Sequence, residues 1–173
     1  GPSAPRRFLA VLSAGSPAPL DRGSGRLQLA DALVAHPLAA RVIANRVWAL
    51  HFGRGLVSTP SNFGALGARP THPELLDYLA RYLVEHGWSL KALHRLILTS
   101  RTFGLASDVD SAAYARNAQI DPDANLLWRA RRRRREIEEI RDALLVIGGR
   151  LDRTVGGASF IDLDASARRT VYT

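Results

Sequence analysis

Residues 71–87, THPELLDYLARYLVEHG, decide the fold of this chain. Threonine followed three residues later by glutamate, with proline between them, is typical of a capped helix start, so Thr71 is predicted to cap the helix together with Glu74. Large apolar side chains then recur every three or four residues until Gly87. The stretch therefore predicts an amphipathic helix whose buried face consists of Leu75, Leu76, Leu79, Tyr82 and Leu83.

A second helix follows almost at once. Ser89 is predicted to be its N-cap, because a serine directly before a periodic apolar segment is a common helix start. The inward-facing side chains are predicted to be Leu90, Leu93, Leu96 and Ile97. Since only Gly87 and Trp88 separate the two helices, we expect them to form an antiparallel αα-hairpin.

Two more helices are predicted before the hairpin, over residues 26–36 and 37–52. Pro37 separates them, because proline ends one helix and suits the first turn of the next, and Gly53 ends the second helix. The buried face of this second helix is predicted to consist of Leu38, Val42, Ile43, Val47 and Leu50. Residues 53–71 then form a long irregular segment, which is typical of a functional loop or an Ω-loop.

The part of the chain after the hairpin is less regular. Residues 111–119 predict a short helix, and residues 121–123, Asp-Pro-Asp, predict a turn. A long helix is predicted to start near Leu126 or Arg131 and to end at Ile147. Its apolar side chains fall on one seam, made of Ile137, Ile140, Leu144, Ile147 and Leu151.

These patterns define the fold class as mainly α. We expect an irregular helical domain over residues 26–173, with about five to six helices, long ordered loops and little or no β-structure. Residues 1–25 are rich in Gly, Pro, Ser and Ala and predict an extended lead-in. Segments 160–164 and 170–172 alternate polar and apolar residues as strands do, without an obvious pairing partner.

The composition excludes several kinds of cofactor chemistry. The 173 residues contain no cysteine, which removes disulfides, thiolate zinc sites, iron–sulfur clusters and covalent haem attachment. We therefore expect no cofactor in this chain. No apolar run approaches the roughly 18–20 residues of a membrane span. The formal net charge of +8, from 24 basic and 16 acidic residues, allows an anionic partner without requiring one.

The most basic segment is a run of arginines followed by glutamates: Arg129, residues 131–135, Glu136, Glu138 and Glu139. Such a density of guanidinium groups suits a polyanion. On a helix, however, Arg134 would pair with Glu138 one turn away, and Arg135 would pair in the same way with Glu139. The sequence contains no helix-turn-helix, zinc-finger or RNP motif that would support nucleic-acid binding. The favoured interpretation is a structural network of ion pairs.

A mixed polar and aromatic stripe lies on the predicted helix 37–52. It consists of Arg41, Asn45 and Trp48, with Arg46 beside them. In a buried network, the arginines would pair with Glu138 or Asp142, because buried polar groups need partners. The alternative is a site for a sugar or a small anion, in which tryptophan stacks while arginine and asparagine donate. The binding candidates are these four residues together with Arg141 and Asp142.

Motifs for catalysis or metal binding are weak. No histidine lies four residues from another, and no H-E-x-x-H motif is present, so no metal site is predicted. The sequence also lacks G-x-S-x-G, S-x-x-K and P-loop motifs. If the chain is an enzyme domain, its catalytic candidates are His51, His72, Glu74 and Asp77. The sequence itself compels no enzymatic activity.

Several segments together resemble one family. Residues 38–48, LAARVIANRVW, and 51–57, HFGRGLV, resemble its ARVxxNRxWxxxFGxGLV motif. Residues 60–64, PSNFG, and 70–77, PTHPELLD, resemble its TPxxFGxxGxxPTHPELLD motif, and residues 140–142, IRD, continue the similarity. The family is the planctomycete-specific PSD-type domain of unknown function (domain of unknown function 1553).

The resemblance covers about Arg26 to Tyr172 and implies the N-terminal portion of a longer family domain. It also implies an exported, periplasmic or otherwise extracytoplasmic protein that contains a companion domain of unknown function and a cytochrome-c-like segment. Any haem would then be bound elsewhere in the full-length protein. One departure from the family pattern is His36, because asparagine is usual before this proline.

Three hypotheses about function follow. The leading one is a non-catalytic module that binds another domain of the same polypeptide, or an anionic glycan. The first alternative is an enzyme domain that acts, including by oxidation, on an acidic or sulfated polysaccharide. The second alternative is electrostatic binding of nucleic acid through the arginine run.

Overall fold

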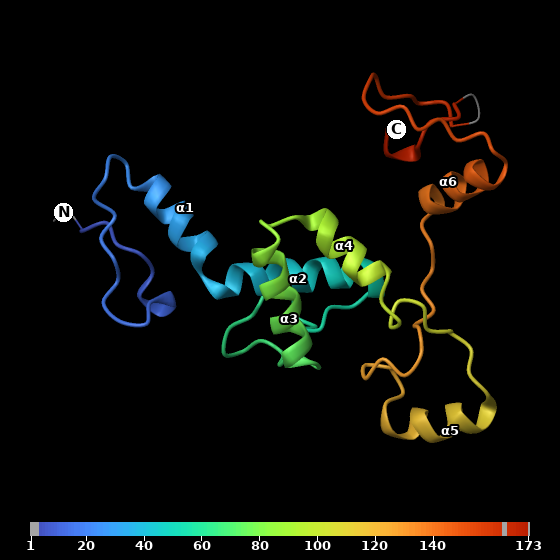
Figure 1. Cartoon of the computed structure of the whole chain (residues 1–173), viewed down its shortest axis with the longest axis horizontal. Coiled ribbons are helices and arrows are strands. Elements are labelled where there is room, and N and C mark those ends of the chain that lie inside the picture. Colours follow the sequence, from blue (N-terminus) through green and yellow to red (C-terminus); the bar gives the residue numbers. More distant parts are fainter. Residues whose placement is uncertain (1–3, 164–165, 173) are drawn as a thin grey trace. The chain divides into compact units, whose positions relative to one another are not determined.

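The computed structural model describes residues 4–163 and 166–172. The chain divides into two compact units, Gly1–Arg131 (unit 1) and Arg132–Thr173 (unit 2). In chain order the described elements are the short 3-10 helix η1 (Ala10–Leu12), α1 (Arg26–Ala35), α2 (Pro37–Phe52), α3 (Pro73–Glu85), α4 (Leu90–Leu98), α5 (Ser111–Ile120), α6 (Ile137–Ile147) and the 3-10 helix η2 (Thr170–Tyr172) (Figure 1). The predicted mainly α class is confirmed.

Strand pairing in the described residues is limited to two isolated bridges. They join Arg7 with Pro19 and Asp152 with Arg168. Residues 170–172 alternate as a strand would but form the 3-10 helix η2. Residues 160–163 are not in a strand either, and Asp164 lies outside the described residues. A strand needs a neighbour along its length, and this end of the chain bonds instead to side chains of α6.

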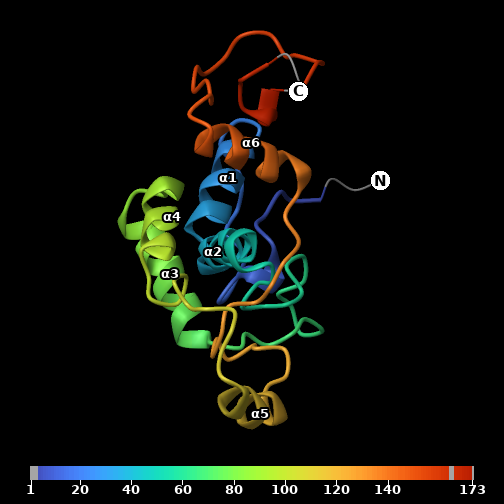
Figure 2. The same cartoon turned by 90° about the vertical axis from the view of Figure 1, so that its right-hand side faces the viewer.

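The core of unit 1 lies between α2 and the hairpin of α3 and α4, which lies on one side of α2 (Figure 2). The predicted αα-hairpin is confirmed: the chain turns at Gly87 and Trp88, both with positive φ, of 64° and 62°. Ser89 caps α4 as predicted, because its hydroxyl accepts a hydrogen bond from the backbone N–H of Ala92 at 3.2 Å. The buried residues of the hairpin are Leu76, Leu79, Ala80, Leu83, Leu93 and Ile97.

Helix α2 buries a face that matches the predicted one only in part: Val47 is buried as predicted, and Ile43 packs against the core. Its buried side chains are Ala40, Ala44, Asn45, Val47 and Trp48. Leu50 was predicted to be buried but is 66% exposed. The alanines are small enough to let α3 approach α2 closely, so the contact forms on their side of the helix. A pattern of large apolar residues does not reveal such a face.

The start of α3 also differs from the prediction. The helix begins at Pro73 with His72 at the N-cap position, and no side chain caps it. Thr71 is occupied elsewhere: its backbone N–H donates to the carbonyl oxygen of Leu56 at 2.9 Å, and its hydroxyl donates to the same oxygen at 3.4 Å. The threonine therefore holds the preceding loop instead of the helix.

His36 caps the start of α2. Its ring Nδ1 accepts a hydrogen bond from the backbone N–H of Leu38 at 3.1 Å, which makes it the N-cap of α2. Pro37 occupies the first position of the helix, where its missing N–H costs nothing.

Helix α6 of unit 2 is shorter than predicted. It begins at Ile137, and residues 131–136 have no regular structure, so the predicted start near Leu126 or Arg131 is wrong. Nε of Arg131 donates to the carbonyl oxygen of Asp123 at 2.7 Å, which holds the chain away from a helical path. Repulsion between successive guanidinium groups also disfavours a helix here.

The apolar seam predicted for α6 is present but exposed. The exposed fractions are 70% for Ile137, 43% for Ile140, 64% for Leu144 and 82% for Ile147. No single helix of the described residues is long and apolar enough to cross a membrane. Only α1 and α2 taken together reach the required length and hydropathy, and they are bent by 65° at their junction.

Candidate functional site

The predicted stripe on α2 contributes to the core of unit 1. Asn45 is fully buried and Trp48 is almost so. Nδ2 of Asn45 donates to the carbonyl oxygen of Val57 at 3.0 Å, and the backbone N–H of Val57 donates to Oδ1 of Asn45 at 2.8 Å. The pair of bonds satisfies polar groups of the loop after α2 that would otherwise be buried without partners. Asn45 is therefore a structural clamp, and it is not available to a ligand.

The clamp also explains a glycine that the motif contains. A Cβ atom at Gly55 would lie 2.6 Å from the carbonyl oxygen of Val57 and 2.7 Å from the side-chain amide of Asn45. Real Cβ atoms do not approach other atoms so closely, so only glycine fits where the loop passes the amide. This tight approach has no signal in the local sequence.

The arginines of the stripe lie at the edge of the core. Nε of Arg41 is 3.2 Å from Oδ1 of Asp77, which joins α2 to α3, and both side chains are partly exposed. The carboxylate that forms an ion pair with Arg41 is thus that of Asp77, whereas the sequence predicted Glu138 or Asp142. Arg46 is exposed. The four residues of the stripe therefore do not form one binding surface.

The two histidines among the catalytic candidates are held in different ways. Nε2 of His51, in the last turn of α2, is 2.7 Å from Nδ1 of His94 on α4. The edge of Phe103 also packs against His51, with 6.0 Å between ring centres. Nδ1 of His72 is 3.0 Å from the hydroxyl oxygen of Thr71. Their contacts lead to different elements of unit 1.

The two carboxylate candidates also have structural roles. Asp77 pairs with Arg41, and Glu74 lies in the first turn of α3, where a negative charge stabilises the helix N-terminus. In the described part of the chain there is no group of three or more His, Cys, Asp or Glu side chains that could hold a metal ion. The contacts of the four catalytic candidates give no support to a shared catalytic centre.

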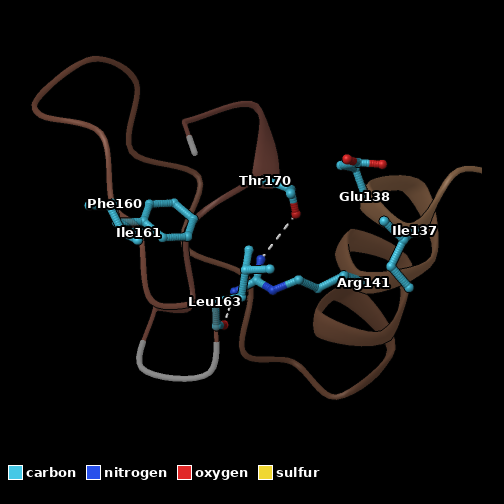
Figure 3. Close-up of a pocket in the computed structure, with 7 residues that line it drawn as sticks. All are labelled: Ile137, Glu138, Arg141, Phe160, Ile161, Leu163 and Thr170. Atoms are coloured by element: carbon cyan, nitrogen blue, oxygen red, sulfur yellow. Dashed lines mark hydrogen bonds between the residues drawn. The ribbon is translucent and has the colours of Figure 1, made fainter.

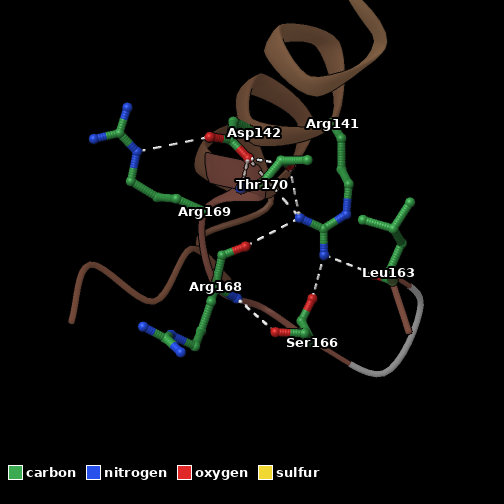
Figure 4. Close-up of polar contacts among 7 residues, drawn as sticks. All are labelled: Arg141, Asp142, Leu163, Ser166, Arg168, Arg169 and Thr170. Carbon is green, nitrogen blue, oxygen red and sulfur yellow. Dashed lines mark hydrogen bonds and ion pairs between the residues drawn. The ribbon is translucent and has the colours of Figure 1, made fainter. Parts of the chain in front are cut away.

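The predicted binding residues Arg141 and Asp142 form a polar centre in unit 2, which we call the α6 clamp (Figure 4). Nη1 of Arg141 donates to the carbonyl oxygen of Arg168 at 3.0 Å and to the hydroxyl of Thr170 at 3.1 Å. Nη2 donates to the carbonyl oxygen of Leu163 at 2.7 Å and to that of Ser166. Both terminal nitrogens are thus satisfied by neutral acceptors of the segment that follows α6.

Asp142 completes the α6 clamp. Its Oδ1 accepts hydrogen bonds from the backbone N–H of Thr170 at 2.9 Å and from the hydroxyl of Thr170 at 2.6 Å. Burial by itself would raise the pKa of Asp142, but these two hydrogen bonds and the charges of Arg169 and Arg141 outweigh it. The pKa of Asp142 therefore lies below its ordinary value of 3.8.

A pocket opens beside the α6 clamp (Figure 3). It has a volume of about 250 Å³, and its lining is mostly apolar: Ile137, Glu138, Arg141, Phe160, Ile161, Leu163 and Thr170. The guanidinium carbon of Arg141 lies 5.7 Å from the centre of the Phe160 ring, so the clamp forms part of the pocket wall. The shape and lining suit an apolar group of another molecule.

The arginine run is extended, and this changes how its ion pairs form. Nη2 of Arg133 lies 2.9 Å from Oε1 of Glu139, and Nη1 of Arg135 lies 3.4 Å from Oε2 of the same residue. Both arginines thus reach the same carboxylate of Glu139 from a segment without regular structure. The predicted pair of Arg135 with Glu139 is confirmed, and the helix that was expected to carry it is wrong.

A further polar cluster was missed by the sequence analysis. Arg54, directly after α2, and Arg131 both donate to Oδ1 of Asn125, at 3.1 and 2.6 Å. The predicted turn at residues 121–123 is present, with the N–H of Ala124 bonded to the carbonyl oxygen of Asp121 at 3.1 Å. Arg54 stands 71 positions before Asn125, and no local pattern announces a contact over that distance.

The fold and these contacts define a class of protein: a mainly α module in which the conspicuous polar residues organise loops, and an open apolar pocket lies on one unit. The comparison with protein families places it more narrowly. The chain belongs to the PSD1 family, described as a protein of unknown function (DUF1553), which matches residues 25–173. The family predicted from the motifs is thereby confirmed. Comparisons with curated proteins and with solved structures give no match.

Proposed function

We propose that the chain is a non-catalytic docking module, and that its unit 2 binds another domain of the same polypeptide through the pocket beside the α6 clamp. The observation that carries this proposal is the pocket itself, whose apolar wall includes Phe160 and Ile161. Ile161 is 98% exposed, and a partner that covers this side chain lowers the free energy of the complex by removing apolar surface from water. An apolar side chain of a partner domain that enters the pocket would bury this wall.

The exposed seam of α6 extends the same surface. Ile137 lines the pocket and belongs to the seam, so pocket and seam share a residue. Single exposed apolar residues are ordinary on a protein surface, but a contiguous set of them is typical of an interaction site. The guanidinium of Arg141 is already bonded to carbonyl oxygens, so this pocket offers little to an anionic glycan.

The family resemblance suggests who the partner is. The domains that accompany this family, a companion of unknown function and a cytochrome-c-like segment, are the partners that we propose, in an exported protein whose haem is bound outside this chain. Neither alternative function gains an observation here. The four catalytic candidates have separate structural contacts, and Arg133 and Arg135 of the arginine run are paired with a glutamate.

The experiment mixes this chain with the remaining domains of its native polypeptide, produced separately, and measures binding by titration calorimetry. Replacing Ile161 with glutamate places a charge in the apolar wall and should weaken binding by at least about tenfold. The matched control is Val155→Glu, at a residue that is 87% exposed in the same unit but does not line the pocket.

Three results would contradict the proposal. One is unchanged affinity in the Ile161→Glu variant. Another is a large loss of thermal stability in the isolated chain with that substitution, because it would show that the chain covers its own pocket. A loss of affinity shared equally by Val155→Glu would count as a general effect of charge and would also contradict it.

A further inference from the structure

The loop after α5, in unit 1, is held rigidly by its own side chains. The carboxylate of Asp121 accepts hydrogen bonds from the backbone N–H groups of Asn125 and of the next residue, at 2.9 and 2.7 Å. The indole N–H of Trp128 donates to the carbonyl oxygen of Asp121 at 2.9 Å. Arg131 is bonded to the carbonyl oxygen of Asp123. These contacts fix the backbone that carries the Asn125 side chain.

Two positive charges meet at this side chain. Nη1 of Arg54 and Nη2 of Arg131 both donate to Oδ1 of Asn125, so the two guanidinium groups lie side by side. Two positive charges that share one hydrogen-bond acceptor repel each other. Burial, followed by the positive charge of Arg54, lowers the pKa of Arg131, which is the expected sign for a cation beside another cation.

The repulsion is offset only in part. Asp123 and Asp121 lie near enough to favour the charged form of Arg131. Neither guanidinium, however, forms an ion pair with any carboxylate of the described residues. Arg54 is exposed, and within the described chain its only hydrogen bond is the one to Asn125. Donors of Arg54 thus remain directed to solvent beside a second guanidinium.

We propose that Arg54 and Arg131 form a binding site for an oxyanion, a carboxylate or sulfate group of an acidic glycan. Guanidinium groups present paired N–H donors that match the paired oxygens of such anions, and an anion between them removes their mutual repulsion. Asn125 is the positioning residue, because its oxygen holds both arginines in place. The site lies in unit 1 and is independent of the docking pocket of unit 2.

Aromatic rings on this loop (Trp128) and on the preceding helix α5 (Tyr114) favour a glycan over other anions. The guanidinium carbon of Arg129 lies 4.9 Å from the ring centre of Trp128 and 5.7 Å from that of Tyr114. Tyr114 is 48% exposed and offers an apolar surface that a sugar ring can contact. A nucleic acid carries a phosphate on every nucleotide and depends on many cationic contacts, whereas this site is one compact pair.

The test uses the 173-residue chain and three probes in titration calorimetry at fixed ionic strength: a polygalacturonate oligomer, a chondroitin sulfate oligomer and an oligothymidylate. Arg54→Gln removes one guanidinium, and Asn125→Asp supplies an internal carboxylate that neutralises the pair. Each should weaken glycan binding by at least about tenfold. Arg81→Gln, which removes an exposed arginine on α3, is the matched control and should bind as the wild type does.

The three probes and the variants distinguish which anionic group binds and whether this site binds it. Polygalacturonate carries only carboxylates, so its binding identifies the carboxylate as sufficient, whereas binding of chondroitin sulfate alone identifies the sulfate group. The thermal stability of Asn125→Asp should not fall, which separates loss of the site from loss of the fold. The proposal is overturned if Arg54→Gln binds normally, if Arg81→Gln loses as much affinity, or if the oligothymidylate binds as tightly as the glycans.

Discussion

Every buried apolar side chain of the described residues lies in unit 1. In the described part of unit 2, the buried side chain is that of Thr170, which is polar. In unit 1, leucines of α3 and α4 pack against one side of α2, and the polar clamp at Asn45 closes a loop over that core. In unit 2, the α6 clamp holds a loop directly, with apolar residues left exposed around it. The comparison shows two ways to order a long loop in one chain.

The two arrangements respond differently to their surroundings. Burial of apolar area depends little on pH, so the core of unit 1 should keep its stability over a wide pH range. Hydrogen bonds to a carboxylate depend on its protonation, so the stability of the α6 clamp should change with pH. The effects of substitutions on stability should therefore be larger in the core of unit 1, and only those in the α6 clamp should depend strongly on pH. The following experiments test this difference.

The largest effect is expected in the core of unit 1. Leu83 on α3 is fully buried, so Leu83→Ala removes apolar side-chain surface that is buried on folding and leaves a cavity. We expect a loss of about 2–5 kcal/mol in the free energy of unfolding, measured by chemical denaturation with circular dichroism. Leu50→Ala on α2 is the matched control, since Leu50 is mostly exposed and should change stability by less than about 0.5 kcal/mol. Equal losses in both variants would mean that the core lies elsewhere.

The next effect concerns the buried clamp of the same unit. Asn45→Ala leaves both the N–H and the carbonyl oxygen of Val57 buried without partners, at a cost of about 2–3 kcal/mol. The loop after α2 should also exchange its amide hydrogens faster. Asn62→Ala is the control, because the bond from the Gly64 N–H to Oδ1 of Asn62 is exposed. A loss no larger than that of Asn62→Ala would contradict the clamp.

Much of unit 1 was predictable from sequence because its signals are local. The hairpin, most of its leucine face and the Ser89 cap each depend on residues within a few positions of one another, and these predictions are confirmed. The exception is Leu90, which was predicted to face inward but is 48% exposed. The caps at Thr71 and His36 show the limit. Thr71 has the right spacing for a cap but is bonded to Leu56, a residue of the loop, whereas a histidine, His36, serves as the cap of α2.

The site residues were harder to predict because their contacts are distant in sequence. Asn45 and Trp48 were recognised as unusual, but spacing alone does not show that Asn45 bonds to a loop twelve residues away. The convergence of Arg54 and Arg131 on Asn125 has no local pattern at all. Periodicity reports which face of an element is apolar, and it does not report which backbone groups a folded loop leaves without partners.

The α6 clamp should be sensitive to acid, unlike the core of unit 1. The pKa of Asp142 is lower in the folded chain than its ordinary 3.8, so its carboxylate stabilises the fold fully above that value. This contribution is lost as the pH falls through 3.8 toward the lower folded-state pKa. We expect protection of the Thr170 amide to fall by about 1–2 kcal/mol over this range, measured by hydrogen exchange corrected for the intrinsic rate.

Asp142→Asn is the control for this titration, because it should give weaker protection at neutral pH and no further loss on acidification. The pKa of Asp121 in unit 1 is lowered as well, so the measurement must follow the Thr170 amide itself and not a global signal. Thr170 protection that stays constant down to pH 3 would show that the carboxylate does not hold the segment.

The smallest effect is expected for the ion pair between Arg41 and Asp77, which joins α2 to α3 at the rim of the core. Its nitrogen and oxygen are 3.2 Å apart, but the side chains are 36% and 56% exposed, so water screens their attraction. A double-mutant cycle with Arg41→Gln and Asp77→Asn should give a coupling energy below about 1 kcal/mol that declines further with added salt. Burial of leucine already fixes the packing of these helices, so the ion pair adds little to it. A coupling as large as the loss in Leu83→Ala would instead place a charged contact among the main stabilising interactions of unit 1, and the contrast with the α6 clamp would not hold.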